Sequence, residues 1–148
     1  MNNGAGVEYY FGYKYPNSDL SLQDFRSRDR MWTISRYALD FFTLFAIPFW
    51  NMKESSSLLS LPNINSCMAT SGKSEVIIYL RNGGTETVNL SDIPLTTSYD
   101  VHWYDPLNGG QLQRGTLNTI SGGGLKSIGN PPSGNSSQKD WAIRLRKI

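Results

Sequence analysis

The sequence predicts an α+β fold in which one strand–helix unit precedes a small antiparallel β-sandwich. A single stretch, residues 21–50, has the apolar spacing and the length of a long helix. Beyond residue 65 the chain changes to short runs of β-branched and aromatic residues, separated by turns rich in Gly, Asn and Pro. The first pattern is typical of a helix that is covered on more than one side, and the second is typical of a sandwich.

Composition narrows the class of protein. A chain of 148 residues holds one ordinary domain, or a small domain with part of another. An apolar share of 39% and a charged share of 18% are those of a globular protein. The formal net charge of +2 is too small for a nucleic-acid-binding face, so we expect no nucleic-acid partner. The apolar run at residues 38–50 is too short and too interrupted to cross a bilayer, so no membrane partner is expected.

Residues 6–13, GVEYYFGY, have the composition of a strand bracketed by glycines. Burying a carboxylate against an apolar helix is costly, so Glu8 and Tyr10 are expected on the polar side of this strand. Turn-forming residues follow in residues 14–20 and lead the chain into the helix. One strand–helix unit cannot bury its own surfaces, so we expect the chain to be the C-terminal part of a larger protein.

The helix has recognisable ends and a wide apolar surface. Ser21 is the expected N-cap, and Asp24 is at the third helical position, where an acidic side chain completes the capping pair. Pro48 ends the run. Apolar residues recur at intervals of seven and three, and further apolar residues widen that stripe. The stripe consists of Phe25, Trp32, Leu39 and Phe42, and the residues that widen it are Met31, Ile34, Ala38, Phe41 and Phe45.

The rest of the chain is predicted to be strands. Residues 53–65 are expected to form a linker, and residues 67–70 a short first strand. Residues 75–81 and 85–90 flank an Asn-Gly-Gly turn and are predicted to pair as a hairpin. Lone Cys67 cannot form an internal disulfide, and its setting predicts a small buried hydrophobe.

Two further strands complete the predicted sandwich. Residues 100–105 end at Pro106, and residues 110–117 are expected to pair with them. The closing strand, residues 140–146, alternates between the two faces of its sheet, which makes about seven short strands in all. We expect Trp141, Ile143 and Leu145 to point inward, and Arg144 and Arg146 to point outward.

These segments resemble a known pair of domains. GVEYYFGYKYPNSDL and RSRDRMWTISRYALDFF, followed by IPFWNM, resemble the last strand and helix of the (β/α) barrel in bacterial apiosidase-like glycoside hydrolases. EVIIYLRNGGTETVNL, VHWYDPLNGG and DWAIRLR resemble the small β-sandwich appended to such barrels, whose family is labelled a collagen-binding domain. The resemblance implies a terminal barrel unit in residues 1–52, a linker in residues 53–65 and a β-sandwich accessory domain in residues 66–148.

The resemblance also implies a function for the longer parent protein, which would be a glycoside hydrolase with a carbohydrate substrate. In such barrels the catalytic carboxylates lie at the ends of earlier strands, which this sequence does not contain. Retaining hydrolysis needs two carboxyl groups about 5 Å apart, and no such pair can be placed here. We therefore expect no catalysis by the chain alone, no cofactor and no metal site. The parent is expected to be secreted or periplasmic, although residues 1–10 show no secretion signal.

Three residues of the first predicted strand are candidates for substrate binding in the parent. Glu8 could hydrogen-bond a sugar hydroxyl, Tyr10 could stack on the ring, and Tyr13 could add a second aromatic surface. The alternative is that Glu8 pairs with an arginine elsewhere in the barrel.

A second candidate site lies in the sandwich. Trp103 and Tyr104 point to opposite faces of their predicted strand, so one is expected in the core and the other exposed as a ligand platform. His102 is the only histidine, and we expect it to be a satisfied or surface residue.

Two roles remain open for the sandwich. It either supports the barrel, through Phe49, Trp50 and Met52, or binds an extracellular polymer such as polysaccharide or collagen.

Overall fold

The computed structural model describes residues 29–132 and 139–148, in which one α-helix precedes eight strands. The strand predicted at residues 6–13 and the predicted helix start at residues 21–28 lie outside the described residues. The helix is α1 (Asp29–Leu44) and is followed by the 3-10 turn η2 (Phe49–Asn51). The other elements are β1 (Met52–Glu54), η3 (Ser56–Leu58), β2 (Ser66–Thr70), β3 (Glu75–Leu80), β4 (Thr87–Asn89), β5 (Ser98–Tyr104), β6 (Thr119–Ser121), β7 (Leu125–Ser127) and β8 (Trp141–Lys147).

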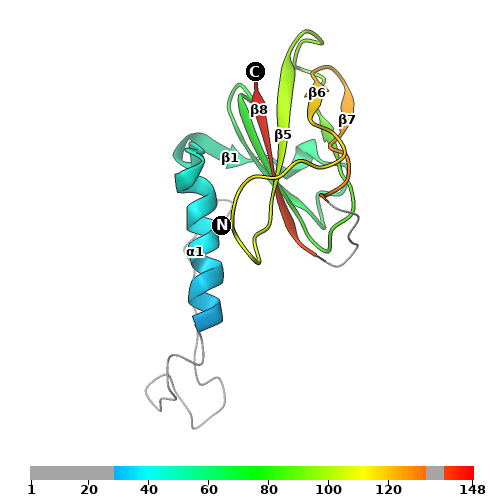
Figure 1. Ribbon diagram of the computed structural model, residues 1–148. Coiled ribbons are helices and arrows are strands. Elements are labelled where there is room, and N and C mark those ends of the chain that lie inside the picture. The colour runs from blue at the N-terminus through cyan, green and yellow to red at the C-terminus, as the bar shows by residue number, and fades with distance from the viewer. Residues whose placement is uncertain (1–28, 133–138) are drawn as a thin grey trace.

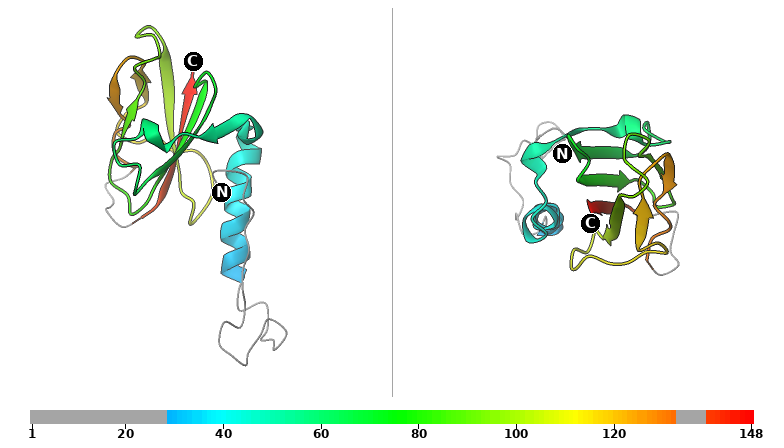
Figure 2. Two further views of the ribbon diagram at one scale, coloured as in Figure 1. Left: turned by 180° about the vertical axis from the view of Figure 1, so that it is seen from behind. Right: turned by 90° about the horizontal axis from the view of Figure 1, so that it is seen from above.

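The strands form two antiparallel sheets, which confirms the predicted α+β fold with a β-sandwich. The large sheet has the order β1-β2-β3-β8-β5-β6, and β4 pairs with β7 in the small sheet. The closing strand β8 lies at the centre, where Ile143 is level with Ile78 of β3 and Trp103 of β5. Seen from above, α1 lies on one side of the large sheet and β7 on the other (Figure 2). The fold therefore has three layers: helix, large sheet and small sheet.

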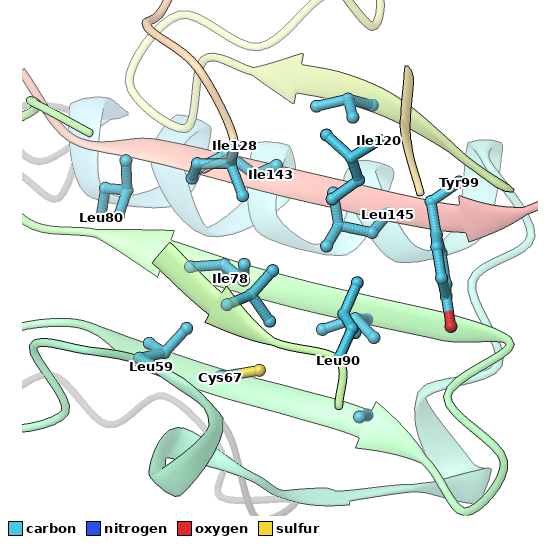
Figure 3. Close-up of a cluster of buried hydrophobic side chains, with 14 of the residues drawn as sticks. Leu59, Cys67, Ile78, Leu80, Leu90, Tyr99, Ile120, Ile128, Ile143 and Leu145 are labelled. Carbon is cyan, nitrogen blue, oxygen red and sulfur yellow. The ribbon is translucent and has the colours of Figure 1, made fainter. Parts of the chain in front are cut away.

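The main core fills the space between the two sheets. Alternation along β8 turns Trp141, Ile143 and Leu145 to this side, as predicted, and all three are buried. Figure 3 shows Ile143 and Leu145 among the aliphatic side chains of neighbouring strands. Cys67 lies in the same cluster with no exposed surface, and burial raises the pKa of its thiol to about 12. The prediction of a small buried hydrophobe at this position is confirmed.

A second apolar cluster lies on the opposite face of the large sheet and holds α1 there. Phe41 is its buried helical member, and its ring centroid lies 4.8 Å from that of Tyr104. The helix ends where Ala46 takes a positive φ of 50° and the Ile47 amide donates to the Phe42 carbonyl at 2.9 Å. This reversal brings Ile47 into the cluster. The members contributed by the sheet are Met52, Met68, Ile77, Tyr104 and Ala142.

Two predicted strand pairings are corrected by the structure. Residues 85–90 do not form a hairpin with β3, because β3 lies between β2 and β8 and β4 pairs with β7 instead. Of residues 110–117, only Gln113 bridges β5, at Trp103, and the strand that pairs with the start of β5 is β6.

The predicted linker at residues 53–65 is also corrected, because these residues are part of the sandwich. Lys53 and Glu54 belong to β1, which pairs with β2. Leu59 bridges Val88 of the small sheet and is buried in the main core. In the structure the sandwich therefore begins at Met52.

Candidate functional site

The candidate substrate-binding residues Glu8, Tyr10 and Tyr13 lie outside the described residues. The second candidate site can be examined directly. Trp103 and Tyr104 do point to opposite faces of β5, but neither is exposed: Trp103 is in the main core and Tyr104 is under α1. The expectation that one of these rings forms an exposed platform is wrong, because a helix covers the face of the sheet that Tyr104 occupies.

The uncovered part of that same face is polar. Arg144, predicted to point to solvent, is buried there and makes two parallel hydrogen bonds to Glu75, from Nε at 2.9 Å and from Nη2 at 2.6 Å. Arg146, also predicted to point outward, does so, and its Nε lies 3.8 Å from Glu75 Oε1. Two arginines thus share one carboxylate, and the three groups form a structural ion-pair network.

His102 lies beside this network, level with Arg144 across the sheet. Its Nδ1 lies 3.5 Å from Asp100 Oδ2, and the other oxygen of that carboxylate, Oδ1, accepts a hydrogen bond from Arg114. Burial lowers the pKa of His102 despite the attraction of Asp100, and the nearby arginines lower it further. No nucleophile among the described residues is part of this group. The expectation of a satisfied or surface histidine is not met, because His102 is partly buried and its Nδ1 makes no hydrogen bond within the described residues.

The buried carboxylates of the described residues are all engaged in structural contacts. Glu86 accepts hydrogen bonds from Ser60 and Asn65, and these, with the Thr87 amide, outweigh burial and hold its pKa below the ordinary value. Glu75 is paired with Arg144. Asp105 accepts hydrogen bonds from backbone amides and from Lys139. Residues 29–132 and 139–148 contain no group of three or more His, Cys, Asp or Glu side chains placed to hold a metal ion.

The most distinctive surface of the described chain is the side of α1 that faces away from the sheet. Leu39 is 61% exposed, and Phe42 follows one helical turn later. The Phe42 ring lies 5.6 Å from that of Phe49, and the Phe49 ring lies 5.3 Å from that of Trp50, which is 69% exposed. We call the exposed residues Leu39, Phe49 and Trp50 the outward face. Phe42 lies at its edge, because its ring is partly buried against the cluster beneath the helix.

Local geometry explains why this helix is apolar on two sides. Leu39 and Phe41 are two residues apart, which at 3.6 residues per turn puts them on nearly opposite sides of α1. Phe41 is buried against the sheet, so Leu39 points away from it. The charged pair Arg36 and Asp40 occupies the remaining side, with Nε and Oδ2 3.5 Å apart. The helix therefore has apolar side chains on two sides, and the sandwich covers one of them.

The sequence located part of this surface. Of the three residues predicted to join the sandwich to a barrel, Phe49 and Trp50 are on the outward face. Met52 is not, because as the first residue of β1 it is buried in the cluster beneath the helix. Leu39 and Phe42 could be found in the sequence because they belong to the apolar stripe with intervals of seven and three. The sequence could not show which of the helix's apolar residues face the sandwich.

Fold and surface together define a small antiparallel β-sandwich preceded by a helix that has a second apolar face. Residues 59–146 match the family described as "Putative collagen-binding domain of a collagenase". The chain belongs to this family. No curated protein matches it.

Solved structures share the fold over nearly the whole chain. One, titled "Glycoside hydrolase", is 14% identical, has a TM-score of 0.63 and is matched over 91% of this chain. A family 5 glycoside hydrolase from Bacteroides vulgatus ATCC 8482 is also 14% identical, with a TM-score of 0.61 and 99% of this chain covered. The chain spans 30% of the length of each of these structures. No helix among the described residues is long and apolar enough to cross a membrane.

Proposed function

We propose that this chain is the C-terminal accessory part of a glycoside hydrolase, in which the sandwich supports a catalytic (β/α) barrel. The observation that supports the proposal most directly is the outward face, in which Leu39 of α1 and Phe49 and Trp50 of η2 are exposed apolar side chains. Contiguous exposed apolar side chains of this size are typical of surfaces that bind another protein body. The family match and the fold shared with two much longer glycoside hydrolases support this identity for the missing partner.

The energetics favour a covered outward face. Fully burying a large apolar side chain stabilises by about 1.5–3 kcal/mol, so covering these residues stabilises by several times that amount. In the proposed arrangement α1 is the last outer helix of the barrel, and its other apolar side packs on the sandwich. The accessory domain then begins at Met52, where β1 joins the large sheet.

We further propose that residues 6–13 supply the strand before this helix, with Glu8, Tyr10 and Tyr13 forming part of the sugar site of the parent. Active sites of such barrels lie at the carboxyl ends of their strands, and Tyr13 would be the last residue of this strand, with Tyr10 and then Glu8 before it. In the parent enzyme, Glu8→Gln and Tyr10→Ala should raise KM for the sugar substrate. A lower stability with unchanged KM would instead favour the alternative, a structural ion pair at Glu8.

The genomic DNA upstream of the Met1 codon tests the assembly directly. The proposal expects an open reading frame that continues upstream and encodes alternating strands and helices with acidic residues at strand ends. A stop codon in frame just before Met1 would contradict it. The purified chain should release no sugar from polysaccharides or aryl glycosides, and release of sugar by the chain alone would also contradict it.

The family description favours a second candidate function, binding to an extracellular polymer such as collagen or polysaccharide. Trp103 and Tyr104 are buried, so exposed residues elsewhere would form the binding surface. Retention of the purified chain on immobilised collagen or polysaccharide, compared with an unrelated protein of similar charge, tests this function. The absence of retention on any polymer would exclude those polymers and leave the supporting role.

A further inference from the structure

We propose that residues 105–112, here called the latch loop, hold the N-terminal half of α1 on the sandwich, and that Gly109 is the residue on which this contact depends. The loop follows β5 and runs beside α1, as the yellow segment in Figure 1 shows. Its effect on the barrel rests on the function proposed above. The latch itself is a property of the described chain and can be tested without a barrel.

Three contacts join the helix to the latch loop and to the end of β5 that precedes it. The Arg30 guanidinium donates from Nη2 to the Leu107 carbonyl at 3.0 Å. The Tyr104 hydroxyl donates to the Tyr37 carbonyl at 2.8 Å. The Tyr37 ring lies against Gly109 so closely that a Cβ there would be 2.4 Å from Cδ1 and 2.7 Å from Cε1. Only a residue without a side chain allows this approach.

The latch loop is itself held rigidly by Asp105. Its Oδ1 accepts the amides of Leu107 and Asn108 at 3.0 and 3.1 Å, and its Oδ2 accepts Asn108 Nδ2 at 2.8 Å and the Lys139 ammonium. The Gly109 amide donates to the Asp105 carbonyl at 2.8 Å. Five donors thus converge on one residue that is only 5% exposed. The position of Gly109 is therefore determined by the sandwich and not by the helix.

The helix needs this contact because its packing on the sheet is concentrated near its C-terminal end. Phe41 is the one fully buried side chain of α1 among the described residues. Arg30 lies about 16 Å before Phe41 along the helix axis, at roughly 1.5 Å per residue. An attachment at one end leaves the angle of a helix free, whereas a second attachment at this distance determines it. The latch loop therefore sets the direction of the outward face.

A matched pair of glycine variants tests the latch in the full chain. Gly109 and Gly110 have positive φ values of 68° and 98°, so alanine is strained at both. A Cβ at Gly110 meets nothing within 4 Å, whereas one at Gly109 meets the Tyr37 ring. Gly109→Ala should increase amide hydrogen exchange of α1 by about tenfold or more, while β3 and β8 keep their protection. Gly110→Ala should leave α1 exchange close to that of the unmodified chain.

Two further variants separate the latch from general instability. Arg30 is exposed, so Arg30→Ala cannot damage the sandwich core and should increase exchange only in α1. Tyr37→Ala should increase α1 exchange by itself, and adding Gly109→Ala to it should have little further effect, because the clashing ring is gone. Equal effects of the two glycine variants, or loss of β3 and β8 protection together with α1, would overturn the proposal. Neither result would bear on whether a barrel binds the outward face.

Discussion

At the residue scale, His102 is the side chain whose protonation state the fold most clearly controls. Burial lowers its pKa, Asp100 opposes the shift, and Arg114, Arg144 and Arg146 reinforce it. In the unfolded chain the imidazole binds a proton at its ordinary pKa of about 6.5. The folded state therefore contributes stability above that pH, and this contribution is lost as pH falls from about 6.5 towards the lower folded pKa.

We predict that His102→Gln makes the free energy of unfolding less dependent on pH in this window. His102 is the only histidine, and carboxylates titrate mainly at lower pH, so the acid slope between about pH 7 and pH 5 reports this residue. Urea denaturation at a series of pH values measures the slope, and the comparison at pH 8, where the imidazole is neutral in both states, gives the baseline. Identical slopes for the two proteins would show that the histidine is not perturbed by folding.

Single residues were predictable from the sequence where the rule was local. Alternation placed Trp141, Ile143 and Leu145 in the main core correctly. The same alternation predicted that Arg144 faces solvent, but Arg144 is buried. Its burial could not be predicted because its partner, Glu75, is 69 residues away in the sequence. Whether a polar side chain on a sheet face is buried depends on which long-range partner lies beside it.

At the scale of elements, the ion pair between Glu75 and Arg144 joins β3 to the central strand β8. We predict that Glu75→Gln destabilises the fold by about 3–5 kcal/mol, because it leaves a buried guanidinium without a countercharge. Arg146→Gln is the matched control: this side chain is 62% exposed and touches the same carboxylate, so its loss should cost at most about 1 kcal/mol. Chemical denaturation of both variants gives the comparison.

A double variant separates the ion pair from simple packing. Replacing both partners, by Glu75→Leu with Arg144→Met, leaves no unpaired charge and should restore most of the stability lost in Glu75→Gln. A cost for Glu75→Gln no greater than that for Arg146→Gln would mean that water reaches the guanidinium and that the pair is not buried in solution.

Most strands were predictable as elements, but their partners were not. The β-branched run of β3 and the alternation of β8 identify strands locally, and the structure contains both. The predicted hairpin after β3 does not form. Glu86 instead accepts hydrogen bonds from Ser60 and Asn65, and the next strand, β4, pairs with β7 in the small sheet. Contacts between distant segments decide which strands pair, and the sequence of a turn alone does not predict those contacts.

At the scale of the whole molecule, the sequence indicated a helix that needs cover on more than one side. The structure supplies one cover, the large sheet, through the cluster around Phe41. The described residues place nothing over Leu39 and Trp50, which are more than half exposed. The apolar periodicity could indicate two covered sides, but it could not identify the partner, because a partner outside the chain has no pattern within it.

Substitutions on the buried side of α1 and on the outward face should have very different effects on the stability of the isolated chain. Phe41→Ala opens a cavity against the sheet and should cost about 3–5 kcal/mol. Leu39→Ser combined with Trp50→Ser removes exposed apolar surface, so it should change stability by no more than about 1 kcal/mol and should reduce self-association. Urea denaturation followed by far-UV circular dichroism measures the first effect, and size-exclusion chromatography over a range of protein concentrations measures the second. If the double serine variant proves as destabilising as Phe41→Ala, the outward face is already packed against another part of this chain, and a separate barrel is not needed to cover it.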